Sequence, residues 1–253
     1  MSNWLSNGPC PKCGSKDNLA TYDDGHQWCW GCGHYVAANG LEVVRKKLLE
    51  PASAPVVQTV ALPYDVEAIY PPEALKWVSK YGLVRSDLVT NRVLWSESSG
   101  LLIFPLTDGE GRIVAWQGRN FGEKYSVKWF GRGSLESTFV FFPRSTARAK
   151  RIIFVEDIIS AIKVGKVIQG LSDLSGTVCQ PVFGSHISRA RLSRCLHIMD
   201  ERHITFWLDN DKFKESIKFR QQANSLGFKA TVINTALDPK EIGLEEIETL
   251  LRG

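Results

Sequence analysis

Two stretches decide the fold of this chain: residues 152–156 (IIFVE) and residues 204–211 (ITFWLDND). Short runs of β-branched and aromatic residues are typical of strands that are buried in a parallel sheet. Each run ends on acidic residues, which are Glu156 after the first and Asp209 and Asp211 after the second. Ligands of open α/β sheets bind outside the carboxyl ends of the strands, so we expect these carboxylates at one sheet edge.

Three carboxylates at one edge repel one another unless a cation lies among them. Oxygen ligands at this density suit Mg²⁺ or Mn²⁺. The alternative is that each strand simply ends on a solvated acid, which is common. An Asp-x-Asp pair directly after a fully apolar run favours the metal, and the sequence therefore predicts a divalent-cation site at Glu156, Asp209 and Asp211.

The rest of residues 151–253 alternates between strand and helix patterns, which predicts an α/β domain with a mostly parallel sheet. We expect helices at 157–168, 188–200, 213–226 and 244–251, and further strands ending at Val182-Phe183 and spanning 228–234. Asp238, in the loop after the last of these strands, brings a fourth acid to the same edge. Cys179 and Cys195 are isolated in the sequence and are expected to be buried thiols.

The preceding segment, residues 67–150, is basic and has an α+β pattern. It predicts short helices beginning near Pro72 and Arg85, strands at 92–95, 100–105 and 112–116, and a hairpin turn at 108–111. Cations then alternate with aromatic residues and glycines, an arrangement that suits phosphates and bases. A solvated basic face explains the same composition equally well. The candidate binding residues are Arg119, Lys124 and Lys128.

The N-terminal residues 1–47 contain two CxxC pairs, Cys10/Cys13 and Cys29/Cys32, with 15 residues between them. This spacing is typical of a zinc site in which two turns each supply two thiolates. An iron–sulfur site or redox-active thiols are the alternatives, and we expect His34 to be a surface residue. A segment this short cannot fold by apolar burial alone, so metal binding, worth about 10–16 kcal/mol, would fold it.

Polar and aromatic residues surround the second cysteine pair. Asp24, His26, Trp28 and Tyr35 are the candidates to bind bases, since aromatic rings stack on unpaired bases and polar groups bond their edges. The alternative is that Trp28 and Trp30 pack the small core of the ribbon, and we expect this of at least one of them. Residues 48–66 contain three prolines and little charge, which predicts an extended linker.

The composition is that of an ordinary globular protein, with 253 residues, 43% hydrophobic and 23% charged, and a net charge of +4. It contains no apolar run of about 18 residues and no signal-peptide pattern, so we expect a cytoplasmic protein without a membrane partner. Six cysteines in such a chain argue against a disulfide framework.

This succession of a zinc ribbon, a linker, a basic α+β segment and an acidic α/β domain resembles the bacterial and phage DNA primases. The resemblance covers nearly the whole chain and is greatest to the primase half of the phage primase–helicases. In the ribbon, Asp24-Gly25-His26 precedes Cys29 and an aromatic residue follows it. Gly118-Arg119 and Lys124-Tyr125 resemble the basic motif of the RNA-polymerase subdomain. The acidic positions of the Toprim fold are matched by Glu156, Asp209, Asp211 and Asp238.

The resemblance implies a primase that makes short RNA primers on single-stranded DNA from ribonucleoside triphosphates by two-metal nucleotidyl transfer, with structural Zn²⁺ and catalytic Mg²⁺ or Mn²⁺. Asp24, His26 and Tyr35 would read the template triplet. Arg119, Lys124 and Lys128 would neutralise phosphate charge, and Glu156 is either a metal ligand or a general base. A separately encoded helicase and a DNA polymerase are the expected partners, in the cytoplasm of a bacterial host if a phage encodes the chain.

The sequence departs from the family pattern at three places. Asp157 and Ser160 stand where the first Toprim motif has glycine and aspartate, and Lys212-Phe213-Lys214 follow the Asp-x-Asp pair. We expect Asp157 to replace part of the charge that Ser160 lacks. No Walker A pattern is found, so we expect no fused helicase. The other functional hypotheses are a Toprim nuclease and a non-catalytic mediator of recombination or replication that only binds DNA.

Overall fold

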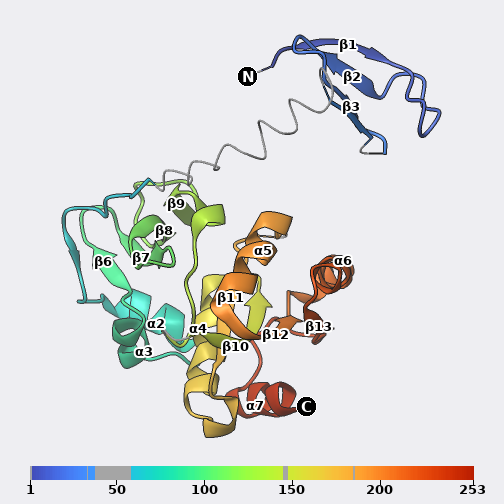
Figure 1. The fold of residues 1–253 in the computed structure, drawn as a ribbon. Coiled ribbons are helices and arrows are strands. Elements are labelled where there is room, and N and C mark those ends of the chain that lie inside the picture. The colour runs from blue at the N-terminus through green and yellow to red at the C-terminus, as the bar shows by residue number, and fades with distance from the viewer. Residues whose placement is uncertain (1, 33, 38–57, 145–147, 185) are drawn as a thin grey trace. The chain divides into compact units, whose positions relative to one another are not determined.

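The computed structural model describes residues 2–32, 34–37, 58–144, 148–184 and 186–253. The chain divides into two compact units, Met1–Val56 and Val57–Gly253 (Figure 1). The linker predicted at 48–66 lies mostly outside the described residues, but its last part belongs to the larger unit, where the Val60 amide donates to the Ile113 carbonyl at 2.9 Å. No described helix is long and apolar enough to cross a membrane.

The smaller unit is a four-stranded antiparallel sheet of short strands in the order β1-β2-β3-β4. The strands are β1 (Trp4–Gly8), β2 (Leu19–Tyr22), β3 (Gln27–Cys29) and β4 (Tyr35–Val36). Its apolar core consists of Cys10, Leu19 and Cys29. The expectation that Trp28 or Trp30 packs this core is wrong, because the two side chains are 38% and 68% exposed.

The first half of the larger unit is an antiparallel sheet in the order β5-β6-β7-β8-β9, preceded in part by two helices. The elements are β5 (Val66–Glu67), α2 (Pro72–Ser79), α3 (Arg85–Thr90), β6 (Leu94–Ser96), β7 (Leu101–Thr107), β8 (Ile113–Asn120) and β9 (Trp129–Gly133). Both predicted helices and the three predicted strands are confirmed within a few residues at their ends. The strand β9 was not predicted.

The second half is a four-stranded sheet in the order β11-β10-β12-β13, and every neighbouring pair is parallel. Its strands are β10 (Ala149–Val155), β11 (Thr177–Pro181), β12 (Met199–Phe206) and β13 (Lys229–Val232). The connecting and terminal helices are α4 (Ile158–Gln169), α5 (Arg189–Ile198), α6 (Phe213–Ser225) and α7 (Leu244–Arg252). The predicted α/β class with a parallel sheet is confirmed.

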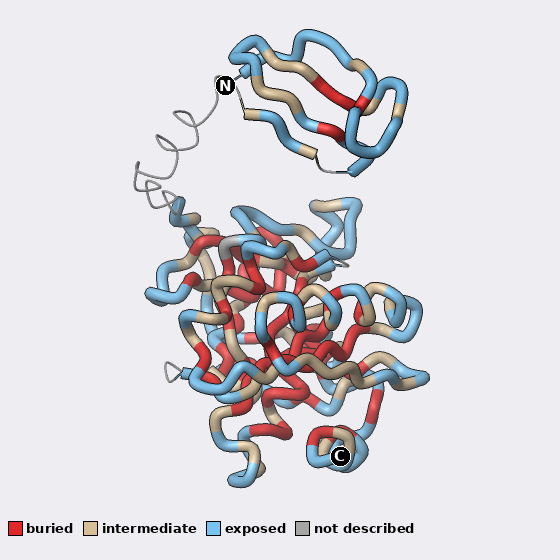
Figure 2. Tube along the Cα trace, turned by 45° about the vertical axis from the view of Figure 1, so that its right-hand side comes forward, coloured by how far each residue is buried: buried red, intermediate tan, exposed pale blue. Residues whose placement is uncertain are grey.

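Successive residues of β10 point to opposite faces of this sheet, as a strand requires. Ile153 and Val155 belong to the core that contains the apolar faces of α4 and α7. Ile152 and Phe154 belong to a second core that contains residues of α5 and α6. Both faces of the parallel sheet are therefore covered, which explains why the sequence of β10 ends in an uninterrupted apolar run. Figure 2 shows the buried residues gathered in the interior of this unit.

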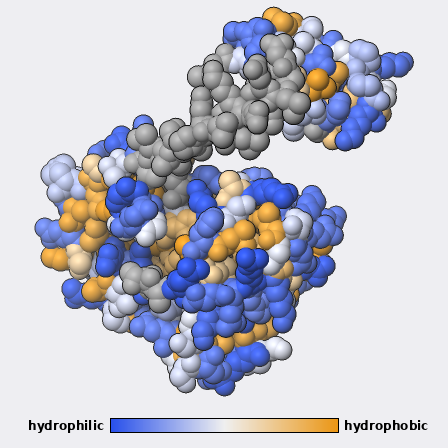
Figure 3. Space-filling view, viewed as in Figure 1, coloured by the Kyte–Doolittle hydropathy of each residue, from blue (hydrophilic) through white to orange (hydrophobic). Residues whose placement is uncertain are grey.

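The core on the α4 side is continuous with the core of the antiparallel half. The same cluster contains Val78 of α2, Leu88 of α3 and Phe104 of β7, together with Ile162 of α4. The two sheets of the larger unit are thus joined by one apolar interior. On the face drawn in Figure 3, the surface of this unit is mainly hydrophilic, with smaller apolar patches.

Candidate functional site

The four cysteines of the smaller unit form a candidate metal centre. Their Sγ atoms all lie within 4.8 Å of one another, and the Cys10–Cys32 and Cys13–Cys29 pairs are each 3.7 Å apart. A tetrahedral Zn²⁺ with bonds of about 2.3 Å requires sulfur–sulfur distances of about 3.8 Å. The four residues therefore fit the predicted zinc ion in both kind and geometry.

The residues predicted to bind bases lie together on this ribbon. The His26 ring stacks on Tyr22 at 4.2 Å between centroids and lies 5.9 Å from Tyr35. Its Nδ1 contacts Asp24 Oδ1 at 2.5 Å, which fixes the orientation of the imidazole. Trp28 faces Tyr35 across the β3–β4 pair, at 6.3 Å. The exposed aromatic faces beside a polar pair form a surface on which unpaired bases can stack.

The acid edge of the parallel sheet begins where β10 and β12 end. These two strands are neighbours, and the Trp207 amide donates to the Phe154 carbonyl at 2.8 Å. Glu156 follows β10 directly and Asp209 lies three residues beyond the end of β12, so both leave the sheet at the same edge. Among the described residues, Glu156 Oε2 and Asp209 Oδ1 are buried oxygens without a hydrogen-bond partner. Such oxygens are costly to bury unless something binds them.

Lys240 lies among the acids, and sequence reasoning missed it. Its Nζ is 2.9 Å from Asp157 Oδ2, 2.9 Å from Asp238 Oδ2 and 3.5 Å from Asp209 Oδ2. The predicted contribution of Asp238 to this edge thus takes the form of an ion pair with a lysine. The only sequence signal was the position of Lys240 two residues after a predicted acid, in the Asp-Pro-Lys turn.

Asp157 and Ser160, the two residues that depart from the expected motif after Glu156, are hydrogen-bonded to each other. Asp157 is the N-cap of α4 and accepts from the Ile159 and Ser160 amides at 2.8 and 2.9 Å. The Ser160 hydroxyl donates to the other carboxylate oxygen, Oδ2, at 3.2 Å. Asp157 therefore both stabilises the helix start, as N-caps do, and holds Lys240.

The acids do not form a preassembled ligand set comparable to the cysteines. Within the described part of the chain, the four cysteines are the one group of three or more potential ligands gathered within 4.8 Å. Asp211 is 71% exposed and turns to Lys212, at 2.6 Å. The donors still fit a divalent cation in kind, since Glu156 and Asp209 each offer a free buried oxygen.

Burial controls the protonation of the acid edge. Burial raises the pKa of Asp209 from 3.8 to about 7, against the opposing charge of Lys240 and with the help of the Glu156 charge. Burial and then the negative charge of Asp211 raise the pKa of Glu156. Deprotonation of Asp209 in the metal-free protein therefore lowers the stability of the folded state.

We predict that Asp209→Asn raises the melting temperature of the metal-free protein at pH 8. The folded pKa of Asp209 lies above its unfolded value of 3.8, so the carboxylate destabilises the fold fully above pH 7 and not at all below pH 3.8. The gain should therefore shrink as the pH falls between these values. Thermal unfolding in EDTA across this range measures it, and a gain independent of pH would contradict the prediction.

A cavity of about 280 Å³ connects the acid edge with the basic segment. It is lined by Trp77, Tyr81, Arg119, Lys128, Trp129, Asp157, Ile159 and Lys240. The Arg119 guanidinium lies over the Trp77 and Trp129 rings, 5.3 and 5.9 Å from their centroids. Arg119 and Lys128 therefore share a cavity with Asp157 and Lys240 of the acid edge. Lys124 instead lies 5.9 Å from the ring of Tyr125.

The two tryptophans of this cavity were also missed. Trp77 lies on the same face of α2 as Ala74 and Val78, but it is only partly buried against the core that contains them. Trp129 begins the unpredicted strand β9, far away in the sequence. Their edge-to-face contact, at 6.0 Å between centroids, depends on tertiary packing and has no local signature.

Comparison with curated proteins by sequence finds a short similarity. A segment of 36 residues is 50% identical to the DNA helicase/primase of Enterobacteria phage T3. It makes up 14% of this chain and spans only 6% of the length of that relative. No family model matches the chain.

Comparison with solved structures finds similarity over the whole chain. The primase fragment of the bacteriophage T7 primase-helicase protein matches with a TM-score of 0.52 and 18% identity, covering 99% of this chain and 98% of the fragment. The zinc-binding and RNA polymerase domains of the Aquifex aeolicus primase match with a TM-score of 0.51 and 15% identity, over 99% and 80%. The RNA polymerase domain of Mycobacterium tuberculosis primase DnaG, in complex with double-stranded DNA, matches with a TM-score of 0.53 and 12% identity. This match covers 72% of this chain and 73% of that domain's chain. The chain therefore has the fold of the zinc-binding and RNA polymerase domains of DNA primases.

Proposed function

We propose that this protein is a DNA primase that synthesises short RNA primers on single-stranded DNA. The observation that carries the proposal is the shared cavity, where Arg119 and Lys128 of the basic segment meet Asp157 and Lys240 of the acid edge. A polymerising site needs cations for the triphosphate beside carboxylates for a catalytic metal. The cavity offers Arg119 and Lys128 as cations, and its lining residue Asp157 adjoins Glu156 in the sequence. The primase folds of the T7 and Aquifex proteins support the same conclusion.

The reaction would be attack of a 3′-hydroxyl on the α-phosphate of a ribonucleoside triphosphate, with release of pyrophosphate. Mg²⁺ or Mn²⁺, held by Glu156, Asp209 and Asp211, would lower the pKa of the attacking hydroxyl and neutralise phosphate charge. Asp238 would act indirectly, by holding Lys240 beside Asp209. Arg119, fixed between two tryptophan rings, would bind the triphosphate together with Lys128, while Lys124 would bind the template outside the cavity.

In this proposal the parts of the chain have separate tasks. Residues 1–47 form a template-reading ribbon, 48–66 a linker, 67–150 a basic subdomain and 151–253 the Toprim catalytic subdomain. The ribbon would act by raising the effective concentration of the template triplet at the catalytic site. Single-stranded DNA and ribonucleoside triphosphates are the proposed ligands, and a separately encoded replicative helicase and DNA polymerase are the proposed partners.

We predict that His26→Ala reduces the preference for one template triplet more than it lowers the rate of bond formation. His26 lies between Tyr22, Asp24 and Tyr35 on the ribbon, which is a different unit of the chain from the one that holds the groups that would perform the chemistry. Dinucleotide synthesis should be compared over a panel of templates that differ in one triplet. The matched control is His186→Ala, at an exposed histidine outside the ribbon. An equal loss on every template would show that the ribbon does not read sequence.

The decisive experiment incubates the protein with labelled ribonucleotides, Mg²⁺ or Mn²⁺, and a panel of single-stranded templates. Primer ladders support the proposal. Template cleavage identifies a Toprim nuclease, and DNA retention without either product identifies a non-catalytic mediator. Lys240 is the observation that favours the mediator as second candidate, because its ammonium already pairs with three carboxylates.

A further inference from the structure

A second and larger cavity lies at the other edge of the parallel sheet. Its volume is about 690 Å³, and it lies between the β7–β8 turn, residues 139–144 and the end of α5. Arg148 and Ile198, which line it, adjoin Ala149 and Met199, the first residues of β10 and β12. These strands carry Glu156 and Asp209 beyond their opposite ends, so roughly 20 Å of strand separates the two sites.

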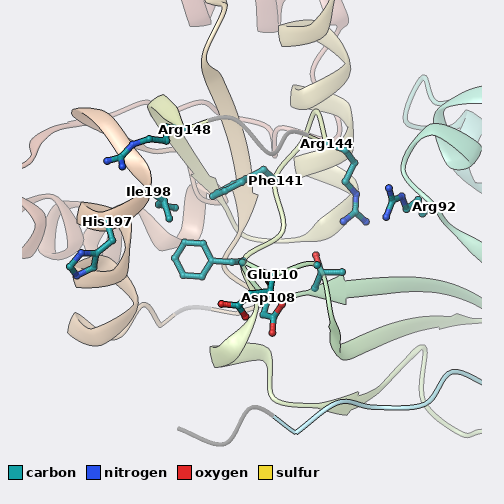
Figure 4. Close-up of a pocket in the computed structure, with 12 residues that line it drawn as sticks. Arg92, Asp108, Glu110, Phe141, Arg144, Arg148, His197 and Ile198 are labelled. Atoms are coloured by element: carbon teal, nitrogen blue, oxygen red, sulfur yellow. Dashed lines mark hydrogen bonds between the residues drawn. The ribbon is translucent and has the colours of Figure 1, made fainter. Parts of the chain in front are cut away.

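Two arginines without an acidic partner meet at one end of this cavity. Figure 4 shows the guanidinium groups of Arg92 and Arg144 pointing toward each other. Arg144 donates through Nη2 to the carbonyls of Asn91 and Pro105, at 3.0 and 3.3 Å, and its buried Nε has no partner. Within the described residues, neither arginine lies within ion-pair distance of a carboxylate.

The other charges around the cavity are ion-paired and sum to one net negative charge, because Arg112 alone faces two carboxylates. Arg148 pairs with Asp200 at 2.7 Å, and Arg112 binds the carboxylates of both Asp108 and Glu110. The excess positive charge therefore belongs to Arg92 and Arg144. Burial, and then the neighbouring Arg92, lowers the pKa of Arg144 to about 10, so the Arg144 guanidinium remains charged at neutral pH. Two adjacent like charges in a partly buried place favour an anion between them.

The backbone at Arg92 supports a ligand-binding role. Its φ is 56°, in the left-handed region that favours glycine, between α3 and β6. Strained non-glycine residues of this kind occur preferentially at functional sites. The strain places a guanidinium at the mouth of the cavity, a position for which glycine would be the more stable residue but would supply no charge.

We propose that this cavity is a phosphate-binding site, in which Arg92 and Arg144 hold the phosphate of a nucleotide or of a single-stranded nucleic acid. Arginine suits phosphate because its planar fork of donors matches two phosphate oxygens. Phe139 and Phe141 also line the cavity and offer apolar surface to the sugar or base. His197 and Arg148 line the far end, where a following phosphate of a strand would lie (Figure 4).

The test compares Arg92→Gly and Arg92→Gln with the wild-type full chain, and Arg202→Gln, at an exposed arginine outside the cavity, is the charge-matched control. Affinities for 5′-AMP and for a labelled oligothymidylate are measured by calorimetry and fluorescence anisotropy. Both Arg92 variants should bind about tenfold more weakly, as expected for one lost charge-assisted hydrogen bond. Arg92→Gly should also melt about 2–4 °C higher, because the backbone strain is relieved.

Hydrogen exchange locates the binding, since a strand would also contact the candidate catalytic site. Protection of residues 107–111 and 196–199 by 5′-AMP identifies a nucleotide ligand, and protection by oligothymidylate alone identifies a strand. For a strand, the Arg92 variants should also reduce the slope of log affinity against log salt by about 0.7. The proposal is overturned if neither probe protects these segments, or if the Arg92 variants bind like the Arg202 control.

Discussion

Replacement of both Asp209 and Asp211 by alanine is expected to abolish dinucleotide synthesis and to leave binding of single-stranded DNA largely intact. The two carboxylates would hold the catalytic metal, and loss of one such electrostatic contact typically slows a reaction by about 10²–10³-fold. Losing both should therefore bring synthesis below detection. Labelled dinucleotide formation in Mg²⁺ and Mn²⁺, together with anisotropy of a labelled template, measures the two effects separately.

The matched control is the double variant Asp173→Ala with Glu248→Ala, which removes the same charge from the pair that contacts Arg252. It should retain synthesis at the wild-type rate. Unchanged synthesis in the Asp209/Asp211 variant would exclude these residues from the reaction. If that variant lost template binding to the same extent as synthesis, its effect would be on binding and not on chemistry.

The second large effect is expected on the smaller unit when its metal is removed. Cys10→Ala with Cys29→Ala should release the zinc and unfold the ribbon, because apart from the metal its core holds little more than those two side chains and Leu19. Structural zinc contributes about 10–16 kcal/mol of binding free energy in domains of this size. Zinc content and hydrogen exchange of the β2 and β3 amides measure the loss.

The control for this prediction is Cys179→Ala with Cys195→Ala, since both cysteines are buried in the larger unit. That variant should keep its zinc and the protection of β2 and β3. The larger unit should melt at the same temperature whether or not the ribbon holds zinc, because the two units have separate cores. Retained protection of β2 and β3 in the zinc-free ribbon would contradict a folding role for the metal.

The sequence predicted those elements whose pattern is local and strongly periodic, such as α4 and β10. It did not predict β9, because Gly131 and Gly133 weaken a strand pattern. In the structure these glycines are what allows the strand to pair closely with β8. A Cβ on Gly133, whose φ is 91°, would lie 2.2 Å from the Val114 carbonyl oxygen. The need for glycine at this position comes from the neighbouring strand β8, and the local sequence does not indicate it.

The sequence could predict those parts of the candidate site whose location depends only on the direction of the strands. Parallel strands end at one edge, so the common location of Glu156 and Asp209 followed from two apolar runs. The ion pairs of Lys240 depend on the conformation of a loop, and the contact between Trp77 and Trp129 depends on how α2 packs on β9. Such non-local contacts are set by the assembled core, and residue spacing does not encode them.

The apolar interior that joins the two sheets of the larger unit has a practical consequence. A polypeptide cut at residue 150 would expose Ile153 and Val155 on one fragment and Val78 and Leu88 on the other, all of which are buried together in the intact chain. Each fragment would then be prone to aggregate, and calorimetry of the intact unit should give a single melting transition. A chimera between this protein and another protein of the same fold should therefore exchange residues 58–253 as one block.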